Sequence, residues 1–260
     1  MQETLGRVLR EWRHIRRFSQ LDLSGLAGVS ARHISFLETG RARPTRGMVL
    51  RLSEVLNMPV NARNQLLIAA GMAPALSNRN LGAKEKEPLH QAMEWMLLNH
   101  EPYPAMALDR HWRLVALNQV AQFLLAPAGL GQGDSLLTAF LHNTVLRDAI
   151  ENIEELEQFM RARLRTELVH LGRDEVLETA IAELESRQNA QSLPRHTSAE
   201  IGVVLTTRFR VGDSVLCLFS TISQFGGAND ELYSELKIEL MFPADEESGA
   251  MLRALPLSNL

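Results

Sequence analysis

The stretch SQLDLSGLAGVSARHISFLE, residues 19–38, has the pattern of two short helices joined by a tight turn. Apolar side chains recur in each half at helical spacing. We expect Leu21, Leu23 and Leu26 to face inward from the first helix, and Ile34 and Leu37 from the second. The stretch therefore predicts a pair of helices that share one small core.

Two serines and a glycine mark the ends of these helices. Ser19 and Ser30 precede the two apolar runs, where a hydroxyl oxygen can accept a hydrogen bond from a backbone N–H that has no partner within the helix. Gly28 lies between the helices, where a turn with positive φ favours a residue without Cβ. The pattern predicts a helix-turn-helix, whose second helix enters the DNA major groove.

Charge is distributed unevenly along the chain. Residues 1–74 contain eleven arginines, no lysine and five acidic residues, a net charge of +6. The remainder holds 16 basic and 26 acidic residues, which leaves −10 and a total of −4. A positive region attracts the phosphate backbone of DNA, and an acidic one is repelled by it. We therefore expect the basic region to bind double-stranded operator DNA.

The first domain is expected to be entirely helical. Besides the helix-turn-helix, apolar periodicity predicts helices at 3–17, 45–57 and 61–70. From Pro74 to Pro88 this periodicity disappears and Asn, Gly, Lys and Glu become frequent, the composition of a solvated linker. We therefore assign residues 1–73 to an all-α helix-turn-helix domain and residues 74–88 to a linker.

Residues 89–260 are expected to form an α+β domain. The pattern predicts a helix at 89–99, then two short strands around a charged turn at 105–118, with Asn118 capping the following helix. Residues 136–187 have helical spacing. Strands are expected at 201–211, 215–225 and 236–242, the first two joined by a hairpin at Gly212-Asp213, before a last helix. The fold class is thus an all-α domain followed by an α+β domain with an antiparallel sheet.

Short motifs stand at fixed offsets within residues 5–70: Leu9-Arg10, Arg13, Ser19-Gln20, Leu23, Leu26-Ala27, Val29-Ser30, Ile34-Ser35, Leu37-Glu38, Gly40-Arg41 and Pro44. Together they resemble the Cro/repressor-type (Xre) helix-turn-helix family. The resemblance implies an ion pair between Arg13 and Glu38 that joins the first and third helices. It also implies that the groove is entered by residues of the second helix of the motif, namely Ala31, Arg32, Ser35 and Phe36.

The chemistry of these residues suits base recognition. Arg32 can donate two hydrogen bonds to guanine, and Ala31 or Phe36 can touch a thymine methyl group. Other residues are expected to hold phosphates, namely Gln20 and Ser30 at helix N-termini and Arg41 and Arg43 on the flanking backbone. Because one such helix reads only a few base pairs, we expect a homodimer on a pseudo-palindromic site.

The second half carries three further motifs: Pro104 to Asn118, the run Arg63-Asn64 to Ala69-Ala70-Gly71 that approaches it, and Phe225-Gly226 to Phe242-Pro243-Ala244-Asp245. They resemble the ligand-binding domain of the MmyB-like transcription regulators, and the strand pair feeding a helix through Asn118 resembles the start of a PAS domain. The resemblance implies a PAS-like sheet over an apolar cavity and a small apolar ligand of the fatty-acid class.

Four side chains of the second half are predicted to surround such a cavity: Phe123, Leu205, Phe209 and Phe219. Arg208, Arg210 and His196 are candidates for a polar anchor, and the pattern does not choose among them. Three functions remain open, namely a ligand-sensing transcription regulator, a DNA-binding regulator whose second domain only dimerises or binds a partner protein, and an enzyme with an added DNA-binding domain.

Other classes of function find little support in the sequence. The histidines and acidic residues lack the spacing of a metal site or a catalytic constellation, so we expect neither enzyme activity nor a metal or organic cofactor. Cys217, the single cysteine, lies in an apolar run and reads as a core thiol. No run of about 20 apolar residues and no signal peptide is seen, so we expect a cytoplasmic protein that does not bind membranes.

Overall fold

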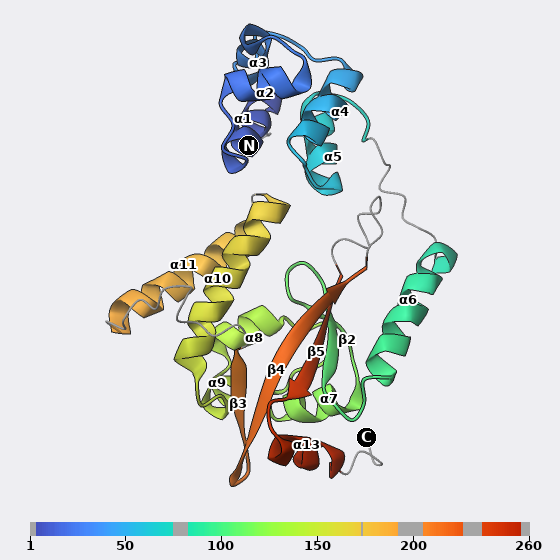
Figure 1. Ribbon diagram of the computed structural model, residues 1–260, viewed down its shortest axis with the longest axis vertical. Coiled ribbons are helices and arrows are strands. Elements are labelled where there is room, and N and C mark those ends of the chain that lie inside the picture. The colour runs from blue at the N-terminus through green and yellow to red at the C-terminus, as the bar shows by residue number, and fades with distance from the viewer. Residues whose placement is uncertain (1–3, 75–82, 173, 192–204, 226–235, 256–260) are drawn as a thin grey trace. The chain divides into compact units, whose positions relative to one another are not determined.

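The computed structural model describes residues 4–74, 83–172, 174–191, 205–225 and 236–255 (Figure 1). Two compact units divide the chain. The first holds Met1–Gly82 and Thr166–Asp174, and the second holds Ala83–Arg165 and Glu175–Leu260.

The first unit begins with the five expected helices: α1 Leu5–Ile15, α2 Gln20–Ala27, α3 Ala31–Glu38, α4 Arg46–Val55 and α5 Val60–Ala69. The ends of α1, α4 and α5 lie within two residues of their predicted ranges. Their apolar faces meet in one core, which includes Val8, Leu9, Trp12, Ile34 and Leu37. The helix-turn-helix is α2, the turn at Gly28, and α3.

The inward face of α2 differs from the sequence expectation. Leu23 is fully buried, but Leu21 is 72% and Leu26 is 60% exposed. The buried position one turn after Leu23 is Ala27, so the inward face follows the i, i+4 spacing of a helix. An eight-residue helix presents only about two turns to the core, and three leucines at spacings of two and three residues cannot all lie on its buried face.

The second unit starts earlier than predicted. Helix α6 spans Ala83–Leu98 and so begins inside the segment assigned to the linker. Ala, Lys and Glu between residues 83 and 87 are good helix formers, which explains the earlier start. Pro88 lies within the helix, where it removes one backbone donor but does not end it. Met93 and Leu97 of α6 pack on one face of the sheet.

The sheet has the strand order β2-β1-β5-β4-β3, and all its neighbours are antiparallel. Its strands are β1 Ala105–Leu108, β2 Leu114–Leu117, β3 Thr206–Val211, β4 Ser214–Gln224 and β5 Lys237–Pro243. The predicted fold class, a helical domain followed by an α+β domain with an antiparallel sheet, is confirmed. The hairpin at Gly212 joins β3 to β4 as expected, while residues 201–204 of the predicted first long strand lie outside the described residues.

Helices cover both faces of this sheet (Figure 1). The remaining elements are α7 Gln119–Leu125, η1 Ala126–Ala128, α8 Leu136–His142, α9 Thr144–Ala149, α10 Ile153–Leu171, α11 Glu175–Gln191 and α13 Glu246–Arg253. Asn118 caps α7 as predicted, since its side-chain oxygen accepts from the N–H of Ala121 at 3.0 Å. The same oxygen accepts from the N–H of Ala105 at 3.0 Å, which ties α7 to the first residue of β1.

Candidate DNA interface and ligand cavity

Side-chain caps define both helices of the helix-turn-helix. The Ser19 hydroxyl accepts from the N–H of Asp22 at 3.0 Å, and the Asp22 carboxylate accepts from the N–H of Ser19 at 2.8 Å. Hydrogen bonds to the Asp22 carboxylate from the Ser19 side chain and the Ser19 backbone lower the pKa of Asp22. The Ser30 hydroxyl accepts from the N–H of His33 at 3.2 Å, and Gly28 has φ +63°. The sequence predicted both caps and the turn.

The outer face of α3 carries the predicted base-reading residues. Arg32 is exposed, and its guanidinium lies over the ring of Phe36 at 5.3 Å from the ring centroid. Ala31, Ser35 and Phe36 are partly buried. The aromatic ring thus packs beneath Arg32 one helical turn away, and the contact limits the conformations of the long side chain.

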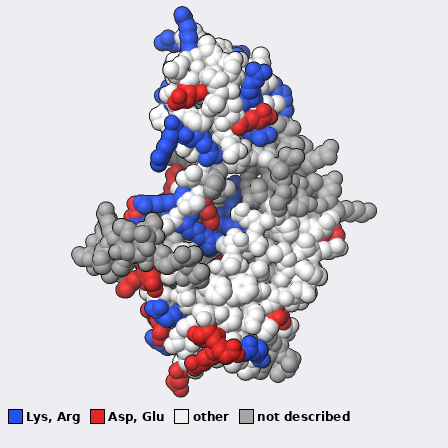
Figure 2. Space-filling model, in the orientation of Figure 1, with Lys and Arg blue, Asp and Glu red and all other residues white. Residues whose placement is uncertain are grey.

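The predicted phosphate contacts have different surroundings. Arg41 and Arg43 are exposed in the loop between α3 and α4. In Figure 2 the surface of the first unit, at the top, shows more blue than red, which agrees with the arginine excess in the sequence. Gln20 is less available, because its amide nitrogen donates to the Glu38 carboxylate at 2.9 Å.

The predicted ion pair between Arg13 and Glu38 is present and bidentate. Arg13 Nε lies 2.6 Å from Glu38 Oε1, and Arg13 Nη2 lies 3.0 Å from Oε2. Arg10 reaches the same carboxylate from the exposed side at 3.4 Å. The Glu38 side chain is fully buried, and this burial raises its pKa, but hydrogen bonds from Arg13 and Gln20 outweigh it and the pKa falls below the ordinary value. The pair fixes the end of α3 on α1.

Close packing of α1 on α3 depends on a residue that the sequence did not single out. A Cβ added to Gly6 would lie 2.3 Å from the carbonyl oxygen of Glu38 and 2.9 Å from that of Leu37. Because both neighbours are backbone atoms, no side-chain rotation could relieve the contact. Gly6 therefore allows the two helices to approach and helps to set the orientation of the recognition helix.

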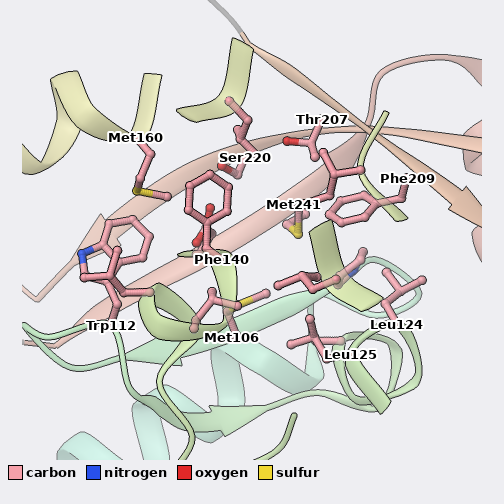
Figure 3. Close-up of a pocket in the computed structure, with 18 of the residues that line it drawn as sticks. Met106, Trp112, Leu124, Leu125, Phe140, Met160, Thr207, Phe209, Ser220 and Met241 are labelled. Atoms are coloured by element: carbon pink, nitrogen blue, oxygen red, sulfur yellow. The ribbon is translucent and has the colours of Figure 1, made fainter. Parts of the chain in front are cut away.

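The second unit contains a cavity of about 110 Å³ between the sheet and its helices (Figure 3). Most of its lining is apolar: Pro104, Met106, Trp112, Ala121, Leu124, Leu125, Leu136, Leu137, Phe140, Leu146, Ile150, Leu156, Phe159, Met160, Phe209 and Met241. The polar lining residues are Arg163, Thr207, Ser220 and Glu239. Such a cavity suits an apolar molecule with a small polar group.

Only one of the four predicted cavity residues, Phe209, lines this space. Phe219 pairs in register with Thr206, whereas Phe209 pairs with Leu216, so alternation puts the two phenylalanines on opposite faces of the sheet. Phe219 stacks on Phe242 at 5.4 Å. Phe123 and Leu205 are partly buried but do not line the cavity. These three residues therefore lie outside this cavity, because side-chain direction depends on a strand register and packing that local patterns do not give.

The candidate anchors do not line the cavity either. Arg208 and Arg210 lie on the opposite face of β3 from Thr207 and Phe209, at 3.9 Å from Glu155 and 3.3 Å from Glu151 respectively. His196 lies outside the described residues. The cation that does line the cavity is Arg163 on α10, which the sequence analysis missed. A signal was present: Leu156, Phe159, Met160 and Arg163 recur at helical spacing, with one arginine on an apolar stripe.

Trp112 closes one end of the cavity from the β1–β2 turn. Its backbone has φ +61°, and its N–H donates to the carbonyl of Asp109 at 3.0 Å. The Asp109 carboxylate accepts from the N–H groups of His111 and Arg113 at 2.8 and 2.9 Å. These hydrogen bonds hold a conformation that is unusual for a bulky residue and direct the indole inward, where it is 1% exposed.

Other kinds of site are not apparent in the described part of the chain. There, no three His, Cys, Asp or Glu side chains gather in a way that could hold a metal ion. Cys217 is only partly buried and so is not the expected core thiol, although burial and the neighbouring Asp245 raise the pKa of its thiol. Within the same residues, no helix has the length and apolar character needed to cross a membrane.

Comparisons with known proteins match both halves of the chain. The family model of the MmyB-like transcription regulator ligand binding domain matches residues 89–255, and a helix-turn-helix domain model matches residues 4–66. Curated relatives from Mycobacterium bovis and from two strains of Mycobacterium tuberculosis are named uncharacterized HTH-type transcriptional regulators. Each is 31% identical over 86 residues, which is 33% of this chain and 33% of the relative.

Proposed function

Because the chain belongs to the MmyB-like transcription regulators, with a helix-turn-helix DNA-binding domain and a ligand-binding domain, we propose that its ligand is a small apolar molecule of the fatty-acid class. Binding of this ligand changes the affinity for operator DNA. The observation that carries the proposal is the cavity, whose lining is apolar apart from four residues. We also propose that the regulator acts in the cytoplasm and that its second domain is PAS-like. In this proposal it uses no metal or organic cofactor and catalyses no reaction.

The volume of the cavity limits how large a ligand can bind without movement of the lining side chains. Its volume of about 110 Å³ is close to that of an engineered cavity of about 150 Å³ that binds benzene. A longer chain therefore needs side chains to move, and the three methionines of the lining, Met106, Met160 and Met241, can rearrange more easily than branched residues. Each methylene transferred from water contributes about 0.8 kcal/mol, so a chain can offset this rearrangement.

Regulation requires only a modest difference in ligand affinity between the DNA-competent arrangement of the protein and the other one. A ligand that binds the DNA-competent arrangement ten times more tightly or weakly than the other needs a difference of about 1.4 kcal/mol. Native mass spectrometry with added decanoate, followed by operator titrations with and without it, tests the proposal. A bound decanoate and a changed operator affinity are expected. If no apolar molecule binds and operator affinity stays constant, the second domain serves dimerisation or a partner protein instead.

We propose that two sets of residues on the first unit bind DNA, one contacting the bases and the other contacting the phosphates. Ala31, Arg32, Ser35 and Phe36 read bases, while Gln20, Ser30, Arg41 and Arg43 hold phosphates. The contact between Arg32 and Phe36 supports this assignment, because it prepares the guanidinium for bidentate bonding to guanine. The hydrogen bond from Gln20 to Glu38 makes Gln20 the weakest member of the phosphate set.

Two arginine variants separate these roles in operator titrations. Arg32→Ala should cost about 1–3 kcal/mol on the operator and relax the preference at one base position. Arg41→Ala should weaken all sequences alike and lower the salt slope by about one. Equal losses on operator and random DNA for Arg32→Ala would contradict base reading.

We further propose that two copies bind together on a pseudo-palindromic operator, with half-sites about 34 Å apart. A short recognition helix reads too few base pairs alone, and a symmetric pair supplies the remaining specificity. Sedimentation of the protein on operator DNA should give a mass of two chains, and footprints should cover two half-sites. A single chain on a single half-site would contradict the dimer.

A further inference from the structure

Positive charge gathers at one end of the cavity, around Trp112. The Arg163 guanidinium lies 4.4 Å from the centroid of the Trp112 ring, and Arg163 also lines the cavity. The Lys237 ammonium lies 4.2 Å from the same centroid. Two cations that approach one buried aromatic ring form a cationic cluster, held in place by attraction to the ring face.

The inner face of β5 extends from this cluster toward the other end of the cavity. Lys237, Glu239 and Met241 alternate along the strand and therefore share one face. Lys237 is 4% and Glu239 is 9% exposed, so both charges are shielded from water. In Figure 3, Trp112 lies at one end of the group of lining residues and Phe209 and Leu124 lie at the other, with Phe140 and Met106 between them. The cavity has a charged end at Trp112 and an uncharged end at Phe209, where Thr207 also lies.

This polarity matches the polarity of an amphiphile with an anionic head. The charged side chains at this end are Arg163 and Glu239, which line the cavity, and Lys237, which shares a strand face with Glu239. A guanidinium has five N–H donors in a planar fork that fits a carboxylate. Arg163 can therefore add a ligand carboxylate to the contacts it already has.

We infer that Arg163 is the anchor that makes the cavity select an anionic amphiphile over a neutral one of the same chain, with Lys237 reinforcing the charge across Trp112. The inference rests on the proposed function, since it names the head group of the same apolar ligand. The ligand carboxylate binds at the Trp112 end, and the chain extends toward Phe209. Arg163 thus determines specificity, and the apolar lining supplies the remaining affinity.

The sheet also limits the length of the chain. Met106 on β1 and Thr207 on β3 line the cavity from strands that are separated by β5 and β4. Three steps between neighbouring strands, at about 4.8 Å each, give a span of about 14 Å. An extended acid of medium length can cross that distance, which makes decanoate a suitable probe and decanol its neutral match.

The test measures binding of decanoate, decanol and methyl decanoate to the full chain by isothermal titration. Wild-type protein should bind decanoate more tightly than both neutral compounds. Arg163→Gln should weaken decanoate by about 10- to 100-fold, the loss of a charged hydrogen-bonding partner, and leave decanol nearly unchanged. Arg163→Lys should restore part of the preference because it keeps the charge.

Arg165→Gln is the matched control. It changes the same residue type on the same helix, but Arg165 is exposed, pairs with Glu185 and does not line the cavity. The control should bind all three compounds like wild type. Melting of each variant without ligand shows that the domain is folded, and decanol binding reports an intact cavity. Equal affinities of wild type for decanoate and decanol, or equal losses of both in Arg163→Gln, would overturn the anchor. Binding of none of the compounds would instead overturn the proposed apolar ligand.

Discussion

The two domains each place a charge inside the protein, a buried one at Glu38 and a partly buried one at Arg163, but in different surroundings. In the first, the Glu38 carboxylate is enclosed and receives hydrogen bonds from Arg13, Gln20 and Arg10. In the second, Arg163 lies in the wall of a cavity of about 110 Å³. The first arrangement is complete within the protein and holds a recognition helix in one orientation. The second places a guanidinium beside an open space, where a ligand can contact it.

The largest effect is expected where the complete arrangement is broken. Arg13→Met should reduce the free energy of unfolding of the first domain by about 3–5 kcal/mol, because it leaves the buried Glu38 carboxylate without its bidentate partner. Hydrogen exchange of backbone amides in α1 and α3 of the full chain measures this change and separates it from unfolding of the second domain.

Arg10→Met is the control for that variant. Arg10 contacts the same carboxylate at 3.4 Å, but its side chain is 51% exposed, so its loss should cost about 0–1 kcal/mol. If both variants cost the same, the bidentate pair does not determine the stability of the first domain, and the contrast between the two domains disappears.

Lowering the pH should destabilise the packing of α3 around Glu38. Although burial raises the pKa of Glu38, hydrogen bonds from Arg13 and Gln20 bring the pKa below its ordinary value of 4.5. A carboxyl with a lower pKa in the folded state adds stability above its unfolded pKa and loses it as the pH falls through the folded pKa. Exchange of α3 amides should therefore accelerate as the pH is lowered below 4.5, after correction for intrinsic rates. Arg13→Met should lack this acid weakening, since burial without the partner favours the protonated form.

Local sequence patterns predicted most of the first domain. Ser19 and Ser30 cap their helices, and Ile34 and Leu37 are buried, because caps and i, i+3 spacing act within one helix. The misplaced Leu21 shows the limit of this reasoning. Which face of a short helix is buried depends on the neighbouring helices, and the approach that Gly6 permits between α1 and α3 depends on backbone contacts far apart in sequence.

The second domain was less predictable because its cavity depends on long-range pairing. Its strands and the Asn118 cap follow from local patterns, but the register of β3 on β4 decides that Phe209 faces the cavity and Phe219 does not. Arg163 was missed for a similar reason. A lone arginine on an apolar stripe can reach solvent or remain inside, and only the packing of α10 over the sheet places it in the lining.

Enlarging one alanine in each domain compares the filled core with the hollow one. Ala27→Leu in α2 should cost about 1–3 kcal/mol, because Ala27 is 2% exposed in a closely packed core. Ala121→Leu in α7 should cost less, since Ala121 lines the cavity and the added carbons can occupy empty space. It should also weaken decanoate binding by occupying part of that space. Hydrogen exchange and titration measure both effects, and an equal loss of stability in the two variants would contradict an open space beside Ala121.

The smallest expected effect comes from glycine substitutions in the helix-turn-helix, which test whether local backbone conformation alone determines its stability. Gly25 lies inside α2, and a Cβ there would meet no atom within 4 Å. Gly25→Ala should therefore stabilise the first domain by about 0.4–1 kcal/mol through the lower entropy of the unfolded chain. Gly28 offers the same open space, but its φ is +63°, so Gly28→Ala should destabilise by about 1–2 kcal/mol. If Gly25→Ala slows the exchange of α2 amides and Gly28→Ala accelerates it, backbone conformation decides the outcome. If both variants destabilise the first domain, the surface of α2 has a role beyond helix formation.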